Sequence, residues 1–384
     1  MTDFKAIIEI IRARYPGSGE VIPLHAPVMG EIEKAYLAAC VDTTFVSSVG
    51  AYVTRFEEEI ARFCGVRHAI ATVNGTAALH MALLLAGVRP GDLVLTQALT
   101  FVATANAVAY CGATPLFLDI DRETLGLDAE ILAAYLVEGC RHEDGQLLDR
   151  ESGRRIAACL PMSTFGLPAD LPHIAALCHE HGLPLVEDAA EALGSYRDGR
   201  HMGTFGQMGT LSFNGNKVIT TGGGGMILTD DDGLAAQARY LTTTAKQSHP
   251  WNYFHDQVGY NYRLPNLNAA FGCAQMERLP GLLADKRQLA AEYTEALTKI
   301  GVPFLVEPAD CVANYWLCAM LLSGPAERDA FLAEAVAAGV QCRPAWTPLH
   351  RLPMYADSPR RPLPVTEEIA DRLVNLPSTP RVGA

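Results

Sequence analysis

Between residues 67 and 228, short β-rich runs alternate with longer stretches whose apolar residues recur at helical spacing. This alternation is typical of an α/β fold with a largely parallel sheet covered by helices. The predicted strands are 69–73, 93–96, 115–118, 156–160, 183–187, 210–213 and 226–229. Helices are predicted at 77–86, directly after Asn74-Gly75-Thr76, and at 171–181, where Pro172 is tolerated in the first turn.

Helical patterns flank this region on both sides. Residues 31–43 and 54–64 are amphipathic, and helical spacing dominates after residue 230. The later predicted elements are helices 233–243, 267–278 and 282–300, strand 317–322, helix 327–338 and strand 340–342. The change predicts a large α/β domain at 1–265 and a smaller α+β domain at 266–384. The long polar insertion at 141–154 predicts an exposed loop.

Composition and charge narrow the classes of protein. The 384 residues are 49% hydrophobic and 19% charged, which is typical of a compact globular chain. The formal charge of −13 argues against nucleic acid or an anionic membrane surface as a partner. No run reaches the ~18 apolar residues of a membrane-spanning helix, and the charged N-terminal pattern is not that of a secretory signal.

Cysteine usage and the common motifs exclude further classes. The ten cysteines form no C-x-x-C pair and no Cys/His cluster with zinc spacing, so we expect reduced core cysteines, a cytoplasmic protein and no metal site. The run of four glycines at 222–225 does not fit G-x-G-x-x-G, and neither a Walker motif nor a G-x-S-x-G elbow occurs. Nicotinamide-dependent, P-loop and hydrolase functions are therefore disfavoured.

Two residues at predicted strand ends suggest a specific chemistry. Asp188 follows strand 183–187, at the sheet edge where α/β proteins bind ligands. Lys217 is the sole lysine between positions 35 and 245, and its apolar, glycine and amide neighbours make it a candidate for a buried nucleophilic amine. Such an amine forms a Schiff base with an aldehyde, which pyridoxal phosphate supplies. A buried carboxylate such as Asp188 would keep the pyridine nitrogen of that cofactor protonated.

The phosphate and the ring of this cofactor would need partners as well. Asn74-Gly75-Thr76 lies between a strand and a helix, where a helix N-terminus attracts an anion and glycine permits close approach. Ser212 offers a further hydroxyl, and Phe101 offers a ring that could stack on the pyridine.

Each feature alone has an ordinary structural explanation. Asp188 could cap a helix at 189–193, and residues 74–76 could be a simple strand-to-helix cap. Phe101 could be a core residue, and Lys217 could lie on the surface. Together, however, the acid, the lysine, the cap and the ring occur in the chain order that one cofactor site on a parallel sheet requires.

Four segments carry a resemblance to a known family. STFGLPAD (163–170), VEDAAEALGS (186–195), GTLSFNGNKVITTGGGGM (209–226) and GYNYRLPNLNAA (259–270) resemble the DegT/DnrJ/EryC1/StrS nucleotide-sugar aminotransferases. The resemblance implies fold type I of the pyridoxal-phosphate enzymes: a large domain with a mostly parallel seven-stranded sheet and a smaller C-terminal α+β domain.

The resemblance also implies roles for individual residues. Lys217 would carry the Schiff base, Asp188 would pair with the pyridine nitrogen, and Phe101 would lie against the ring. Gly75, Thr76 and Ser212 would bind the phosphate. The segment resembling GYNYR reaches the neighbouring subunit's site in this family, so a homodimer is implied, with Asn261 as the phosphate contact across it and Arg263 as a second candidate.

A branch of the family suggests the substrate. Residues 42–58 and 73–107 resemble enzymes that aminate UDP-2-acetamido-2,6-dideoxy-4-ketohexoses, with L-glutamate as donor. Glu191 stands where many members have His or Gln, and Gly223 where many are acidic; Glu191 would hydrogen-bond the phenolic oxygen of the cofactor or the substrate. The candidate substrate contacts, which include residues of the patches 314–316 and 343–350, are His25, Ser47, Ser48, Arg263, Tyr315, Arg343 and His350.

Two alternatives stay open at this point. The acceptor could be another nucleotide sugar, such as GDP-4-keto-6-deoxymannose or a dTDP-ketosugar. The chain could also be a non-catalytic pyridoxal-phosphate protein that serves as a regulator.

Overall fold

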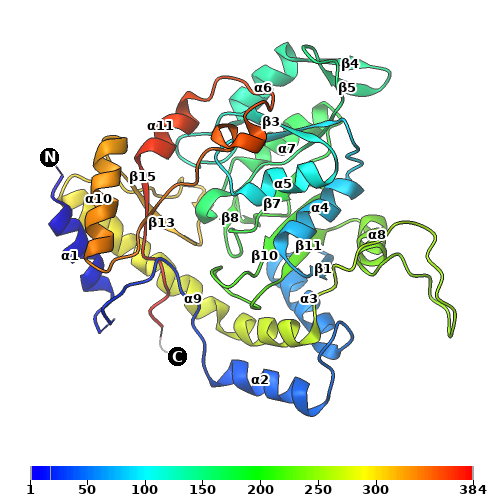
Figure 1. Cartoon of the computed structure of the whole chain (residues 1–384), viewed down its shortest axis with the longest axis horizontal. Helices are drawn as coiled ribbons and strands as arrows, with labels where there is room; N and C mark the ends of the chain where they lie inside the picture. The colour runs from blue at the N-terminus through cyan, green and yellow to red at the C-terminus, as the bar shows by residue number, and fades with distance from the viewer. Residues whose placement is uncertain (1, 18, 383–384) are drawn as a thin grey trace.

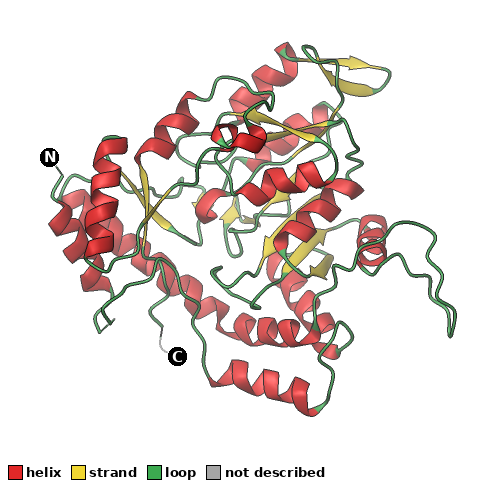
Figure 2. Ribbon diagram, in the orientation of Figure 1, coloured by secondary structure: helices red, strands yellow, loops and turns green. Residues whose placement is uncertain are grey.

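A computed structural model describes residues 2–17 and 19–382, and it is an α/β protein with helices on both faces of a central sheet (Figures 1 and 2). The helices are α1 Phe4–Arg14, α2 Glu31–Asp42, α3 Ala51–Cys64, α4 Gly75–Leu85, α5 Val102–Tyr110, α6 Ala129–Glu138, α7 Leu171–Glu180, α8 Asp232–Thr242, α9 Asn266–Lys299, α10 Pro325–Ala337 and α11 Pro364–Arg372. The strands of the central sheet are β1 His68–Thr72, β2 Leu93–Gln97, β3 Thr114–Leu118, β6 Ile156–Cys159, β7 Val186–Asp188, β10 Met208–Ser212 and β11 Gly225–Thr229. These correspond to the seven predicted strands.

The central strands form two hydrogen-bonded groups. One has the order β1-β11-β10-β7 and the other β3-β2-β6, and parallel bridges from Cys159 to Leu185 and from Met162 to Asp188 connect them. Strand β11 is antiparallel to β1 and β10, whereas β10 with β7 and β2 with β3 and β6 are parallel. The carboxyl ends of the parallel strands therefore lie at one edge, where loops can converge on a ligand.

The two faces of the sheet build separate apolar layers. Because side chains alternate along a strand, Ile70 and Val94 pack with α4, α5 and α8, whereas Leu93 and Leu95 face the opposite side with α3 and α7. The first turns of α4 and α5 are thereby fixed at the sheet edge.

Residues 140–149 form a β-hairpin where the sequence pattern predicts the first part of an exposed loop at 141–154. Strands β4 Cys140–Glu143 and β5 Gln146–Asp149 pair antiparallel, and the two residues between them, Asp144 and Gly145, both have positive φ. An Asp-Gly pair suits this two-residue turn. The prediction was wrong because polar side chains on an exposed hairpin hide the alternation of a strand.

Helix α9 is continuous where two helices were predicted. It includes Pro280, and Leu279 and Leu282 on either side of that proline are buried. The lost backbone hydrogen bond is outweighed by packing of both halves against one core. The predicted strand at 340–342 also differs: β14 is Arg343–Pro344, and Val340 forms only an isolated bridge with Ile22.

The C-terminal region is an α+β layer beside α9. Its strands are β13 Cys318–Leu321, β14 and β15 Leu373–Leu376, and a further small sheet comprises β8 Tyr196–Arg197, β9 Arg200–His201 and β12 Cys311–Val312. Helix α1 contacts α9 and α10, with Phe4 against Phe331 at 5.5 Å between ring centroids. The division at residue 265 stays a prediction.

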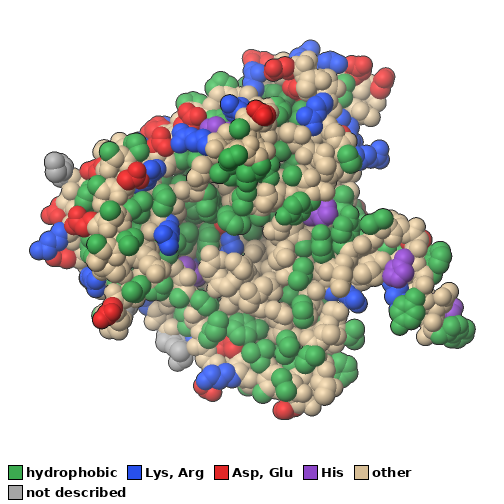
Figure 3. All heavy atoms as spheres, viewed as in Figure 1, with side chains coloured by type: hydrophobic (Ala, Val, Ile, Leu, Met, Phe, Trp, Pro, Cys, Tyr) green, Lys and Arg blue, Asp and Glu red, His purple; other side chains and the backbone are tan. Residues whose placement is uncertain are grey.

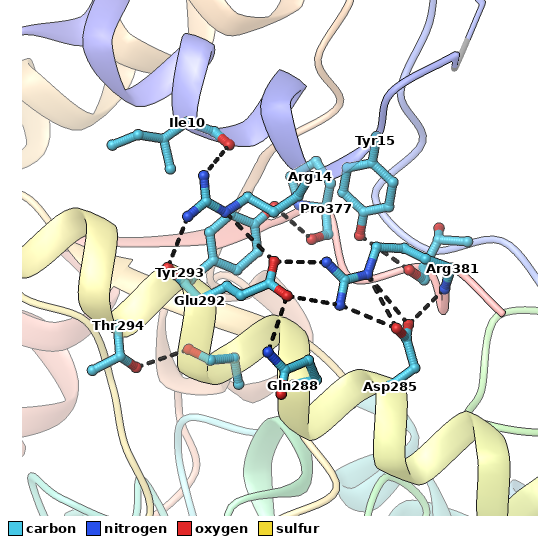
Figure 4. Close-up of polar contacts among 12 residues, drawn as sticks. Ile10, Arg14, Tyr15, Asp285, Gln288, Glu292, Tyr293, Thr294, Pro377 and Arg381 are labelled. Atoms are coloured by element: carbon cyan, nitrogen blue, oxygen red, sulfur yellow. Dashed lines mark hydrogen bonds and ion pairs between the residues drawn. The ribbon is translucent and has the colours of Figure 1, made fainter.

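A polar cluster fastens both ends of the chain to α9 (Figure 4). Arg381 forms ion pairs with Asp285 at 3.1 Å and with Glu292 at 2.7 Å. Arg14 of α1 donates to the carbonyl oxygen of Glu292, and Tyr293 donates to that of Pro377 at 3.0 Å. Helix α9 thus connects the chain ends to the edge of the central sheet. Among the described residues, no helix is both long and apolar enough to cross a membrane.

Candidate functional site

A cavity of about 260 Å³ opens at the carboxyl ends of the central strands. The predicted site residues in its lining are Gly75, Thr76, Phe101, Asp188, Glu191, Ser212 and Lys217. They come from the first turn of α4, the residue before α5, the ends of β7 and β10, and the loops after these two strands. The parallel sheet thus brings together residues that are far apart in the sequence.

Lys217 lies in the loop after β10 and points into this cavity. Its side chain is only 12% exposed, so a surface position is excluded. The Nζ atom is 3.0 Å from Oε1 of Glu191 and 3.9 Å from the centroid of the Trp316 ring. The amine therefore has a carboxylate and an aromatic face as fixed neighbours.

Asp188 ends β7 and is buried. Its Oδ2 accepts a hydrogen bond from the Thr104 hydroxyl at 2.7 Å, and its Oδ1 accepts from the Ala190 N–H at 3.1 Å. Burial raises the pKa of Asp188, whereas these two donors and the Lys217 charge act in the opposite direction. No helix follows at 189–193, so the helix-cap explanation for Asp188 is wrong.

Glu191 is a second buried acid beside the lysine. Its Oε2 accepts from the Phe165 N–H at 2.9 Å, while Oε1 faces Lys217. Burial raises the pKa of Glu191 to about 7, and the nearby Lys217 charge and these hydrogen bonds lower it in part. Glu191 is therefore able to hold a proton or give it up near neutral pH.

The N-terminus of α4 forms a cradle with the end of β10. The Asn74 side chain accepts from the Ala77 N–H at 2.8 Å and caps the helix, as a simple cap would. Gly75 lies so close to β10 that a Cβ there would be 2.9 Å from Cβ of Ser212. Glycine thus lets the helix N-terminus and the Ser212 hydroxyl face the same cavity, an arrangement that suits a phosphate.

Aromatic side chains border the cavity. Phe101 is 47% exposed, so it is not a core residue, and its ring centroid is 5.9 Å from that of Trp346. Trp346 in turn lies 4.7 Å from the ring of Phe165. A planar ligand ring in the cavity would stack on these aromatic side chains.

All seven predicted substrate residues, and the predicted phosphate contact Asn261, lie outside the lining of this cavity, and their roles stay predictions. Tyr315 accepts from the Glu307 N–H, and His350 contacts Glu367 at 3.1 Å, so these side chains are engaged elsewhere. The two ring nitrogens of His25 are buried, and neither has a hydrogen-bond partner in the structure. The others outside the lining are Ser47, Ser48, Asn261, Arg263 and Arg343, of which Ser47, Asn261 and Arg343 are exposed.

Thr104 and the hydrogen bond that it donates to Asp188 were not foreseen. A sequence signal for it was available, because Thr104 lies three residues after Phe101 in the first turn of α5, and the preceding strand β2 is two strands from β7. Trp316 and Trp346, which line the cavity, lie in the patches 314–316 and 343–350. The residues predicted there as substrate contacts were instead Tyr315, Arg343 and His350.

The donor set fits pyridoxal phosphate. An amine, a buried acid, a phosphate cradle and an exposed aromatic ring share one cavity, and Gly75 leaves the space that a side chain would fill. Lys217 would attach the cofactor, Asp188 would pair with its ring nitrogen, and Gly75, Thr76 and Ser212 would hold its phosphate.

Comparison with known proteins identifies relatives of this chain. The DegT/DnrJ/EryC1/StrS aminotransferase family model matches residues 27–384. GDP-perosamine synthase of Caulobacter vibrioides is 37% identical over 362 residues, which cover 93% of each chain. UDP-N-acetyl-3-dehydro-alpha-D-glucosamine 3-aminotransferase of Acidithiobacillus ferrooxidans is 31% identical over 93% of this chain and 91% of that one. The solved aminotransferase TlmJ of Streptoalloteichus hindustanus matches with a TM-score of 0.84 at 30% identity, over 93% of each chain.

The Glu191→Gln variant tests the buried acid through the pH dependence of stability. The pKa of Glu191 in the folded chain, about 7, exceeds its ordinary value of 4.5, so the protonated carboxyl stabilises the folded wild type. This stabilisation is complete below pH ~4.5 and is lost as the pH rises to ~7. Glu191→Gln has no carboxyl group at this position, so its stability does not fall in this way as the pH rises. Its free energy of unfolding relative to wild type, measured by urea denaturation, should increase by about 2 kcal/mol between about pH 5 and about pH 8.

Glu368→Gln is the matched control for this measurement. Hydrogen bonds from Arg122 and Arg372 lower the pKa of Glu368 to about 2. That group titrates below the tested range, so its variant should show the same difference from wild type at both pH values. Equal differences for Glu191→Gln at the two pH values would contradict the account.

Proposed function

We propose that this chain, which belongs to the DegT/DnrJ/EryC1/StrS aminotransferase family, transfers an amino group to the C4 ketone of a nucleotide-activated sugar. It is a pyridoxal-phosphate-dependent aminotransferase. The observation that carries the proposal is that Lys217 and Asp188 line one cavity with the cradle of Gly75, Thr76 and Ser212.

Bound pyridoxal phosphate supplies an aldehyde and an electron-withdrawing ring through which an amino group passes from donor to acceptor. In the proposal, Asp188 keeps the ring nitrogen protonated, and the Thr104 hydroxyl orients that carboxylate. Lys217 moves the proton at the carbon that gains or loses the amine. Glu191, 3.0 Å from the Nζ atom, holds the lysine in position when its amine is free.

We also propose which sugar accepts the amino group. Our first candidate is UDP-2-acetamido-2,6-dideoxy-4-ketohexose, with L-glutamate as donor and UDP-4-amino-4,6-dideoxy-GlcNAc and 2-oxoglutarate as products. The resemblance of residues 42–58 and 73–107 to that branch supports it. The match to GDP-perosamine synthase supports a second candidate, GDP-4-keto-6-deoxymannose.

A homodimer with a composite site is also proposed. An arm between α8 and α9 projects from the body, and Figure 3 shows apolar side chains gathered at its tip. Trp251 is 80% exposed, and Tyr253, Phe254 and Val258 are more than half exposed. Apolar exposure of this extent on a projecting arm is typical of an interface. Asn261 follows directly at the base of the arm, which supports its predicted contact across the dimer.

We place the enzyme in the cytoplasm. The ten cysteines are free and buried, as expected where thiols stay reduced.

The Lys217→Ala variant tests the role of the amine. Removing the nucleophile should reduce turnover of glutamate and ketosugar by more than about a thousandfold, because no other group replaces it. The assay follows 2-oxoglutarate, with Lys299→Ala on the exposed end of α9 as the control. Turnover by Lys217→Ala near the wild-type rate would refute the assignment.

The acceptor is tested by parallel assays with the UDP, GDP and dTDP 4-keto-6-deoxy sugars. The kcat/KM for formation of 2-oxoglutarate should be at least about a hundredfold higher with the UDP sugar than with the other two. The reason is that protein groups that hydrogen-bond the acetamido group would lose their partner when the sugar carries a hydroxyl there. A preference for the GDP sugar would support the second candidate instead. If no sugar reacts and glutamate leaves the absorbance of the bound cofactor unchanged, the chain is a pyridoxal-phosphate regulator.

The dimer is tested by Trp251→Ser and Phe254→Ser. Light scattering should give twice the chain mass for the wild type and a dissociation constant at least about tenfold higher for each variant, since both remove exposed apolar contacts. Val137→Ser changes a residue that is 69% exposed on α6, away from the arm, and should remain dimeric. A monomeric wild type would overturn the proposal.

A further inference from the structure

Lys286 is a fully buried lysine on α9 that the proposed reaction does not use. Its Nζ atom donates to the carbonyl oxygens of Trp316 at 3.1 Å and Ser378 at 2.7 Å. Burial lowers the pKa of Lys286 to about 7. Both the charged and the neutral amine carry at least two N–H groups, so both carbonyls have a donor in either form.

Trp316 connects this buried amine to the cavity. Its indole N–H donates to the carbonyl oxygen of Asn216 at 2.6 Å, and its backbone N–H donates to Oδ1 of Asn314 at 2.7 Å. Its ring lies 3.9 Å from Nζ of Lys217. One residue therefore contacts the candidate nucleophile, the residue preceding that nucleophile, and the buried lysine.

We propose that Lys286 is a positioning residue: it anchors the backbone of Trp316, so that the indole covers one side of the Lys217 amine. The inference rests on the proposed role of Lys217 as the reactive amine. Lys286 does not touch the cavity and acts only through Trp316.

The contact with the C-terminal segment does not explain the buried lysine by itself. That segment is already held by Tyr293, which donates to Pro377, and by Arg381, which pairs with Asp285 and Glu292. A buried lysine requires partners for its polar hydrogens. Of the two hydrogen bonds that Lys286 donates, the one to Trp316 connects it to the site.

The test measures how readily the Lys217 amine reacts in the full-length chain freed of carbonyl compounds by dialysis against hydroxylamine. Trace acetic anhydride labels lysines, and mass spectrometry gives the rate at Lys217 relative to Lys5, whose side chain is 83% exposed. Lys286→Met should raise this ratio about tenfold, the factor that corresponds to one hydrogen bond of ~1.4 kcal/mol. Trp316→Leu removes the cover itself and should give at least as large a ratio.

Tyr293→Phe is the matched control, because it removes a buried bond from α9 to the C-terminal segment without touching Trp316. Its labelling ratio should equal that of the wild type. If Lys286→Met does not fold, Lys286→Gln, which removes the charge and shortens the donor, takes its place with the same expected direction.

The proposal is overturned if Lys286→Met and Lys286→Gln label like the wild type, if Tyr293→Phe raises the ratio equally, or if Trp316→Leu leaves it unchanged. The measurement uses neither nucleotide sugar nor cofactor. A failure here is therefore distinct from a failure of the proposed function, which the turnover assays detect.

Discussion

The candidate site depends on keeping a lysine and two carboxylates together out of water. A buried charge without a partner costs several kcal/mol, and here Lys217 faces Glu191 at 3.0 Å while Asp188 receives hydrogen bonds from Thr104 and Ala190. Since β7 and β10 are parallel neighbours, their loops present both acids and the lysine at one edge. The sheet topology thus places each buried charged group beside a partner that offsets the cost of its burial.

Helix α9 gives the site its second support. Its C-terminal half is fastened to the C-terminal segment by Arg381 and Tyr293 and to α1 by Arg14, and Lys286 on the same helix reaches Trp316 beside the cavity. The stability of the terminal segments and the geometry around Lys217 are thus connected through one rigid element.

Much of the fold could be predicted from the hydrophobic pattern, and the exceptions have physical causes. The central strands are buried on both faces, so their β-rich runs are conspicuous. The hairpin at 140–149 is exposed and polar, and Pro280 breaks the local helix signal although packing retains the helix. For the site, the strand ends and the glycine cap identified Lys217, Asp188, Gly75 and Ser212. The place of Thr104 beside Phe101 was a signal that was not used, whereas the contacts of Lys286 depend on tertiary packing that the sequence does not show. The contact predicted for Asn261 involves a second chain.

Of the six lysines of the chain, Lys217 is the one that we expect to form the covalent link to pyridoxal phosphate. Borohydride reduction of the protein with this cofactor, followed by peptide mass spectrometry, tests it directly. We expect the pyridoxyl label on Lys217 in nearly every molecule. A label on another lysine, such as Lys286, or no stoichiometric label at all, would contradict it.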